Sequence, residues 1–228
     1  MVKPKICVTI TASSNLETFE TIQKVLNYSP DLIELRLDYM HEEPDLKTIR
    51  ESTSKPIIAT FRRIDQGGVK KCTEVNRVQR LLDACEAGVN YLDLEFNTPN
   101  ITDIIEKVHK LGIEVIISYH NFKITPKKER LQGIIEDIIE KGADICKIIG
   151  TAIYPRDNIT YFKLIDENPK IRLVSFAMGK TGMMSRIFSP IHGAEYTYAS
   201  AYKGKESALG QLTIFELNQI YRYIGVIN

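Results

Sequence analysis

The feature that most constrains the fold of this chain is a regular alternation of short β-branched runs with helical segments. The runs have the length and composition of buried strands, and they begin at Lys5, Leu32, Pro56, Tyr91, Glu114, Ala143, Ile171 and Ala194. Most of the segments between them have the periodicity of amphipathic helices, at residues 15–28, 74–87, 101–111, 127–141 and 211–223. Residues 181–193 are the least regular part. The alternation predicts an α/β fold with a parallel sheet.

Two α/β architectures share this alternation, the closed (β/α)8 barrel and the open doubly wound sheet. Eight strands favour the barrel, and 228 residues fall within the roughly 200 to 250 that one such barrel needs. Gly88, Gly112 and Gly142 each follow a helical segment and precede a strand, where a left-handed glycine ends a helix. We therefore expect a TIM barrel that forms a single domain over residues 1–228.

Charge and cysteine usage narrow the possible partners and the compartment. The chain has 30 lysines and arginines against 29 acidic residues, so it offers no electrostatic reason to expect nucleic acid or an anionic membrane. Cys7, Cys72, Cys85 and Cys146 show no metal-binding or redox spacing and indicate free thiols in a reducing cytoplasm. The apolar stretch near the N-terminus is too short for a signal peptide or a membrane span.

Ionisable residues recur toward the C-terminal ends of five consecutive expected strands, where the active sites of barrels lie. Alternation along a strand turns Glu34 and Arg36 to the same face. Isolated buried charges are costly, so a cluster of mixed sign facing one cavity indicates a chemical role. The cluster consists of Glu34, Arg36, Arg62, Glu95, His120 and Lys147.

Each of these residues also has a structural interpretation. Lys147 could protect an edge strand, but its apolar flanks indicate a central strand, where low polarity favours the neutral amine that attacks a carbonyl. His120 could be an ordinary structural histidine, or a base whose tautomer is fixed by donating a hydrogen bond to Glu95. Glu34 and Arg36 could form an ion pair inside the barrel.

At these residues the sequence resembles the type I 3-dehydroquinate dehydratases. The matching pieces run in order over nearly the whole chain: ELRLD at 34–38, TFR at 60–62, DLE at 93–95, SYHNF at 118–122, CKI around Lys147, FAMGKTGMMSR at 176–186 and SALGQ at 207–211. The resemblance implies a TIM barrel that dehydrates 3-dehydroquinate to 3-dehydroshikimate in the shikimate pathway. It implies no metal or organic cofactor, a cytoplasmic location and a homodimer.

The resemblance also implies residue roles. Lys147 would form a Schiff base with the substrate ketone, His120 would accept and then donate a proton, and Glu95 would orient His120. The residues implied to bind the substrate are Glu34, Arg36, Arg62, Arg186, Ser207 and Gln211, with Phe122, Phe176 and Met178 as an apolar wall. Phe176 departs from the methionine common in bacterial members. The loop that carries SALGQ would either close over the substrate or be a solvated connection.

Two other functions fit the same fold. A class I aldolase would also use a lysine on a strand, although residues 179–186 supply one arginine and no glycine-rich phosphate loop. A barrel that binds a metabolite or a protein without catalysis is the second alternative, and it predicts the loss of at least one of the chemical residues. The GKT at 179–181 lacks the glycine that a Walker A motif requires.

Overall fold

The computed structural model of the protein describes residues 3–227, and it contains one parallel sheet of eight strands. The hydrogen-bonded order is β7, β6, β5, β4, β3, β2, β1, β8. Before β8, the amide of Glu195 donates to the carbonyl of Leu173, which brings the two ends of the sheet together. The strands are β1 (Ile6–Ile10), β2 (Leu32–Arg36), β3 (Ile57–Thr60), β4 (Tyr91–Glu95), β5 (Glu114–His120), β6 (Ile145–Thr151), β7 (Arg172–Met178) and β8 (Thr197–Ser200).

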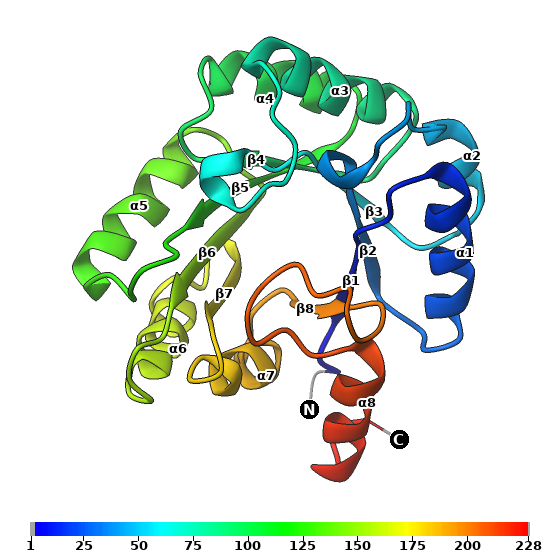
Figure 1. Ribbon diagram of the computed structural model, residues 1–228. Coiled ribbons are helices and arrows are strands. Elements are labelled where there is room, and N and C mark those ends of the chain that lie inside the picture. Colours follow the sequence, from blue (N-terminus) through cyan, green and yellow to red (C-terminus); the bar gives the residue numbers. More distant parts are fainter. Residues whose placement is uncertain (1–2, 228) are drawn as a thin grey trace.

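A helix follows each strand and lies outside the ring of strands (Figure 1). The arrangement is a (β/α)8 barrel, as predicted. The helices are α1 (Asn15–Leu26), α2 (Leu46–Glu51), α3 (Glu74–Glu86), α4 (Ile101–Lys110), α5 (Lys128–Glu140), α6 (Asp157–Glu167), α7 (Met183–His192) and α8 (Ile214–Tyr223), with short 3-10 turns at Leu37–Tyr39 and Ile64–Gln66.

The sequence prediction and the structure differ mainly in the helices. The irregular residues 181–193 form α7, which contains Pro190 within its last turn. Helix α8 begins at Ile214 rather than near residue 211, because Thr213 caps it and exchanges hydrogen bonds with Glu216 in a capping box. Gly88, Gly112 and Gly142 have positive φ, as their positions predicted.

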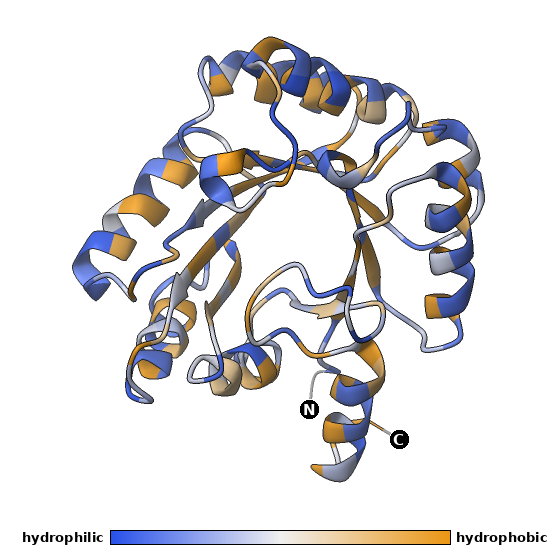
Figure 2. Ribbon diagram, viewed as in Figure 1, coloured by the Kyte–Doolittle hydropathy of each residue, from blue (hydrophilic) through white to orange (hydrophobic). Residues whose placement is uncertain are grey.

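Apolar side chains fill two layers of the barrel. The larger layer lies between the strands and the helices, whose inner faces are hydrophobic (Figure 2). The smaller layer lies inside the ring and includes Ile58, Ile116 and Val174. Within residues 3–227, no helix is long and apolar enough to cross a membrane.

The register of the strands determines which polar side chains lie side by side inside the barrel. Ser118 on β5 pairs with both Glu95 on β4 and Lys147 on β6. Paired residues of parallel strands point to the same face, so these three side chains form one row above the apolar layer. The strands therefore deliver the chemical groups to one rim of the barrel.

Candidate active site

A hollow at the C-terminal rim of the barrel brings the predicted site residues together. It contains about 500 Å³ of space not filled by atoms. Lys147, His120 and all nine residues expected to bind the substrate line it, whereas Glu95 does not. The lining consists of Glu34, Arg36, Arg62, Gln66, Gly67, His120, Phe122, Lys147, Ile149, Phe176, Met178, Arg186, Tyr198, Ser207, Ala208 and Gln211.

The side chain of Lys147 ends between a carboxylate and a phenol. Its Nζ donates to Asp93 Oδ2 at 2.9 Å and to the hydroxyl of Tyr198 at 3.0 Å. Glu34 Oε1 lies 3.7 Å away, and the lysine is only 4% exposed. Lys147, Glu34 and Tyr198 all line the hollow, so the amine lies beside the space where a ligand would sit.

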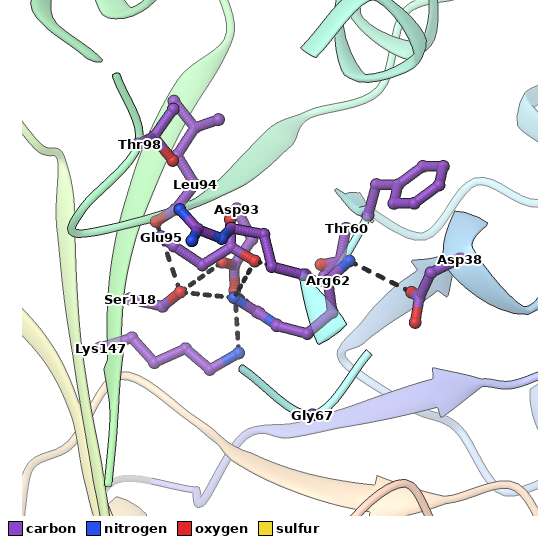
Figure 3. A network of polar contacts seen from close by, with 12 residues as sticks. Asp38, Thr60, Arg62, Gly67, Asp93, Leu94, Glu95, Thr98, Ser118 and Lys147 are labelled. Carbon is purple, nitrogen blue, oxygen red and sulfur yellow. Dashed lines mark hydrogen bonds and ion pairs between the residues drawn. The ribbon is translucent and has the colours of Figure 1, made fainter. Parts of the chain in front are cut away.

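Asp93 is shared by two cations at the centre of this network (Figure 3). Arg62 Nη2 lies 2.8 Å from Asp93 Oδ2, the oxygen that also binds Lys147, and Ser118 donates to Asp93 Oδ1 at 2.7 Å. Burial alone would raise the pKa of the Asp93 carboxyl, but the charges of Arg62 and Lys147 hold it well below its ordinary value. Asp93 is therefore a permanent anion that fixes both cations.

Glu34 and Arg36 do not form the ion pair that their spacing suggested. Glu34 accepts hydrogen bonds from Thr9 and Thr60, both at 3.0 Å. The Arg36 guanidinium instead makes two hydrogen bonds, at 2.8 and 2.7 Å, to Asp38 in the 3-10 turn that follows β2. The 3-10 turn places Asp38 beside Arg36, while Glu34 lies 3.7 Å from the Lys147 amine.

His120 has an unpaired ring nitrogen and no charge at neutral pH. Its Nδ1 is buried and has no hydrogen-bond partner in the described chain. Burial, together with the charges of Arg62 and Lys147, holds its pKa well below the ordinary value. The ring stacks on Phe122 with 5.9 Å between centroids. His120 is thus a neutral base at the edge of the hollow.

Glu95 binds arginines in this structure rather than His120. Its Oε1 accepts from the amide of Arg63 at 2.9 Å and lies 3.4 Å from Arg62, and its Oε2 lies 2.7 Å from Arg77. The hydrogen bond to His120 that the sequence suggested is not among the contacts of residues 3–227. Strand pairing turns Glu95 toward Ser118 and Arg62, so any influence on His120 acts through Arg62.

Arg186 is a buried cation with unused donors. It is 1% exposed, and neither Nε nor Nη2 has a partner among the residues described. Burial lowers its pKa from 12.5 to about 10. Its guanidinium lies 4.5 Å from the ring centroid of Phe176, which with Met178 forms an apolar wall of the hollow. A planar fork of free donors beside an apolar wall suits the carboxylate of a small organic acid.

The loop between β8 and α8 covers part of the hollow (orange in Figure 1). Ser207 donates to Gln211 Oε1 from both its amide, at 2.7 Å, and its hydroxyl, at 3.1 Å. The amide of Gly179 donates to the carbonyl of Leu209 at 2.9 Å, which ties the loop to the end of β7. The structure therefore places SALGQ at the rim of the site.

Sequence reasoning missed several residues of the site, Asp93, Tyr198, Gln66 and Gly67 among them. Asp93 lies two residues before Glu95, and the period of a strand could have placed it on the same face. Tyr198 resembles an ordinary strand aromatic, while Gln66 and Gly67 lie in a turn without regular pattern. In the part of the chain that the structure describes, no three His, Cys, Asp or Glu side chains gather as they would around a metal ion.

This arrangement provides the groups needed for an elimination next to a ketone. An amine at Lys147 can form an imine, which is an electron sink. A neutral imidazole at His120 can remove a proton from the adjacent carbon and return it to a leaving group. Arg186 can hold a carboxylate, and Glu34 and Arg36, which also line the hollow, can hold ring hydroxyls.

Comparisons with known proteins agree with this chemistry. A family model described as type I 3-dehydroquinase matches residues 6–228. A 3-dehydroquinate dehydratase from Dehalococcoides mccartyi (strain CBDB1) is 36% identical, with 99% of this chain and 98% of that protein covered. The corresponding protein from Pyrococcus abyssi is 35% identical, with 90% and 93% covered. A crystal structure of a type I 3-dehydroquinate dehydratase from Clostridium difficile superposes with a TM-score of 0.87 at 26% identity, covering 98% of this chain and 93% of that one.

Proposed function

The chain belongs to the type I 3-dehydroquinase family and dehydrates 3-dehydroquinate, and we propose that Lys147 and His120 carry out this reaction. Arg186 binds the substrate carboxylate. The anion of Asp93, with Glu34, holds the Lys147 amine toward the hollow. The aldolase and the non-catalytic barrel have no comparable support, since the relatives are named as dehydratases and Lys147, His120 and Arg186 are all present.

The proposed reaction has three stages. The Lys147 amine adds to the substrate ketone, and the ketone oxygen leaves as water to give an iminium. Neutral His120 removes a proton from the carbon beside the iminium, and the electron pair forms an enamine. The resulting imidazolium then gives its proton to the hydroxyl on the next carbon, which leaves as water. Addition of water to the conjugated iminium releases 3-dehydroshikimate and restores the lysine.

Glu95 and Arg62 act by positioning in this proposal. Glu95 lies against Arg62, whose charge adds to the effect of burial in holding the pKa of His120 down, so Glu95 supports the acid–base chemistry indirectly. One histidine serves both as base and as acid, so the proton and the hydroxyl leave from the same face of the ring. Ser207 and Gln211, supplied by the loop over the hollow, contribute donors and acceptors to the bound substrate.

The observation that carries the proposal is a buried lysine amine, held by Asp93, that opens into a hollow containing a neutral histidine and an unpaired arginine. Borohydride reduces an iminium to a stable amine. We expect incubation with 3-dehydroquinate and borohydride to add mass at Lys147, and peptide mapping to find no adduct at Lys180, at the rim nearby. An intact, folded protein without an adduct at Lys147 would refute the mechanism.

We also propose that the protein is a cytoplasmic homodimer. Its four cysteines are free thiols, which suits a reducing compartment. Exposed apolar side chains on neighbouring elements support a protein contact: Ile153 and Tyr154 before α6, and Met184 and Phe188 on α7. Light scattering should give twice the 26.0 kDa chain mass; a value equal to one chain at micromolar concentration would refute the dimer.

A further inference from the structure

Tyr198 has no role in the reaction as described so far, although it touches the proposed nucleophile. It lies on β8, is 5% exposed and lines the hollow. Its hydroxyl is 3.0 Å from Lys147 Nζ, and the same amine lies 4.3 Å from the centroid of its ring. The residue is thus fixed against the atom that would form the bond to the substrate.

Imine formation requires protons to move from nitrogen to oxygen. The balanced step converts a lysine ammonium and a ketone into an iminium and water. Of the three ammonium protons, one remains on the iminium nitrogen and two leave with the former ketone oxygen. In the intermediate both atoms are bonded to the same carbon, so a group within hydrogen-bond reach of Nζ can also reach that oxygen. Such a group must be able to accept a proton and to donate one.

The two carboxylates close to Nζ do not meet this requirement. Asp93 remains an anion because Arg62 and Lys147 hold its pKa well below the ordinary value, against the effect of burial, so it accepts but does not donate. Glu34, at 3.7 Å from Nζ, already accepts hydrogen bonds from Thr9 and Thr60. Both groups hold the amine in place but supply no proton to the departing oxygen.

The phenol of Tyr198 can both accept and donate a proton beside Nζ. Burial is the largest reason why the pKa of Tyr198 lies well above its ordinary value, so the hydroxyl keeps its proton at neutral pH. It accepts from Lys147 with a lone pair, while its own proton faces no strong acceptor: Tyr196, at 3.4 Å between hydroxyl oxygens, is another neutral phenol. The proton of Tyr198 is therefore available to a substrate oxygen.

We propose that Tyr198 is a catalytic proton relay for formation and hydrolysis of the Lys147 imine, taking a proton from the lysine nitrogen as it gives its own to the ketone oxygen. In hydrolysis the same protons move in the opposite direction. The relay rests on the proposed imine at Lys147. His120 keeps its proposed proton transfers at the carbon and at the leaving hydroxyl, and Tyr198 adds a second donor and acceptor beside the lysine nitrogen.

Exchange of the ketone oxygen with labelled water isolates this part of the reaction. Incubating the full-length enzyme with 3-dehydroshikimate in ¹⁸O-water exchanges that oxygen each time an imine forms and is hydrolysed, and mass spectrometry follows the gain of label. Tyr198→Phe removes only the hydroxyl and keeps the ring that packs on Tyr196 and Phe176. Tyr196→Phe is the matched control, because it removes a buried hydroxyl that does not line the hollow. Lys147→Ala gives the uncatalysed rate.

We expect Tyr198→Phe to slow the exchange at least tenfold, with the same final label content, while Tyr196→Phe stays within threefold of the unmodified enzyme. Thermal unfolding of each variant checks the fold. Exchange in Tyr198→Phe within threefold of the unmodified enzyme would overturn the relay, as would an equal loss in Tyr196→Phe. A different result bears on the underlying function: if the unmodified enzyme exchanges no faster than Lys147→Ala, there is no imine at Lys147.

Discussion

Replacing Arg186 with methionine should make the protein more stable and nearly inactive. The guanidinium is buried and carries donors without partners, and burial lowers its pKa from 12.5 to about 10. A decrease of that size corresponds to about 3 kcal/mol of unfavourable free energy for the charged form. At pH 7 the Arg186 guanidinium is protonated in both the folded and the unfolded chain, so the full unfavourable free energy of burying its charge is present. It would be relieved only as pH rises from about 10 toward 12.5.

Methionine keeps much of the length of arginine without its charge. We expect Arg186→Met to raise the free energy of unfolding at pH 7 by about 1–3 kcal/mol, since part of the gain is lost to imperfect packing. The same variant loses two charge-assisted hydrogen bonds to the substrate carboxylate, each worth about 1.5–3 kcal/mol. The value of kcat/KM should therefore fall by roughly 10² to 10⁴-fold.

Urea unfolding followed by circular dichroism measures the first effect, and initial rates of formation of the conjugated product measure the second. Arg156→Met is the control, because Arg156 is exposed beside Tyr154 and should change stability by less than about 0.5 kcal/mol. A loss of more than 1 kcal/mol in Arg186→Met would show that the guanidinium has compensating partners. The view of Arg186 as an unpaired cation awaiting a carboxylate would then be wrong.

Three other variants and one change of conditions test the site. His120→Gln should lower kcat by about 10² to 10⁴-fold while still giving the borohydride adduct, and loss of the adduct would assign His120 to imine formation. Because the pKa of His120 is depressed, protonation of His120 should not reduce the enzyme's activity between pH 7.5 and 6.5, and the activity should fall only at lower pH. A decline centred at pH 6.5 in the pH profile of the activity would contradict this. Gly210→Ala should lower kcat/KM at least tenfold, since Gly210 has φ +75° and an added Cβ would clash with the Gly179 carbonyl; unchanged kinetics would show that the loop adapts. Glu17→Gln should raise KM several-fold by releasing Lys205 in the loop over the site, and an unchanged KM would show that this ion pair does not hold the loop.

The sequence predicted the barrel because its strands and most helices have strong local patterns. Most strands are short apolar runs rich in β-branched residues, and the glycines at 88, 112 and 142 end helices in the left-handed conformation their positions required. Helix α7 was less predictable because it contains Pro190, a residue that disfavours helix interiors, and begins after Gly182. The chemical groups of the site were predictable for a related reason: the period of a strand sends alternate side chains to one rim.

The pairing of those groups was less predictable, because it depends on turns and on distances across the barrel. Arg36 binds Asp38 rather than Glu34, owing to a 3-10 turn that no local pattern marks. Glu95 binds Arg77, which comes from α3 outside the barrel, and not His120. Asp93 could have been found from its spacing to Glu95, but nothing in the sequence showed that two cations from other strands meet at its carboxylate.

The shared carboxylate of Asp93 also explains how a buried site can change its covalent structure without reorganising its charges. Lys147 carries one positive charge as an ammonium, and the iminium that replaces it carries one as well. The anion of Asp93 therefore faces the same charge before and after the bond to the substrate forms, and its bond to Arg62 remains in place. The iminium keeps only one N–H, however, whereas the ammonium donates to both Asp93 and Tyr198. Because the charged acceptor is the stronger one, that hydrogen should stay on Asp93, which leaves the hydroxyl of Tyr198 free for the water that must attack the iminium carbon.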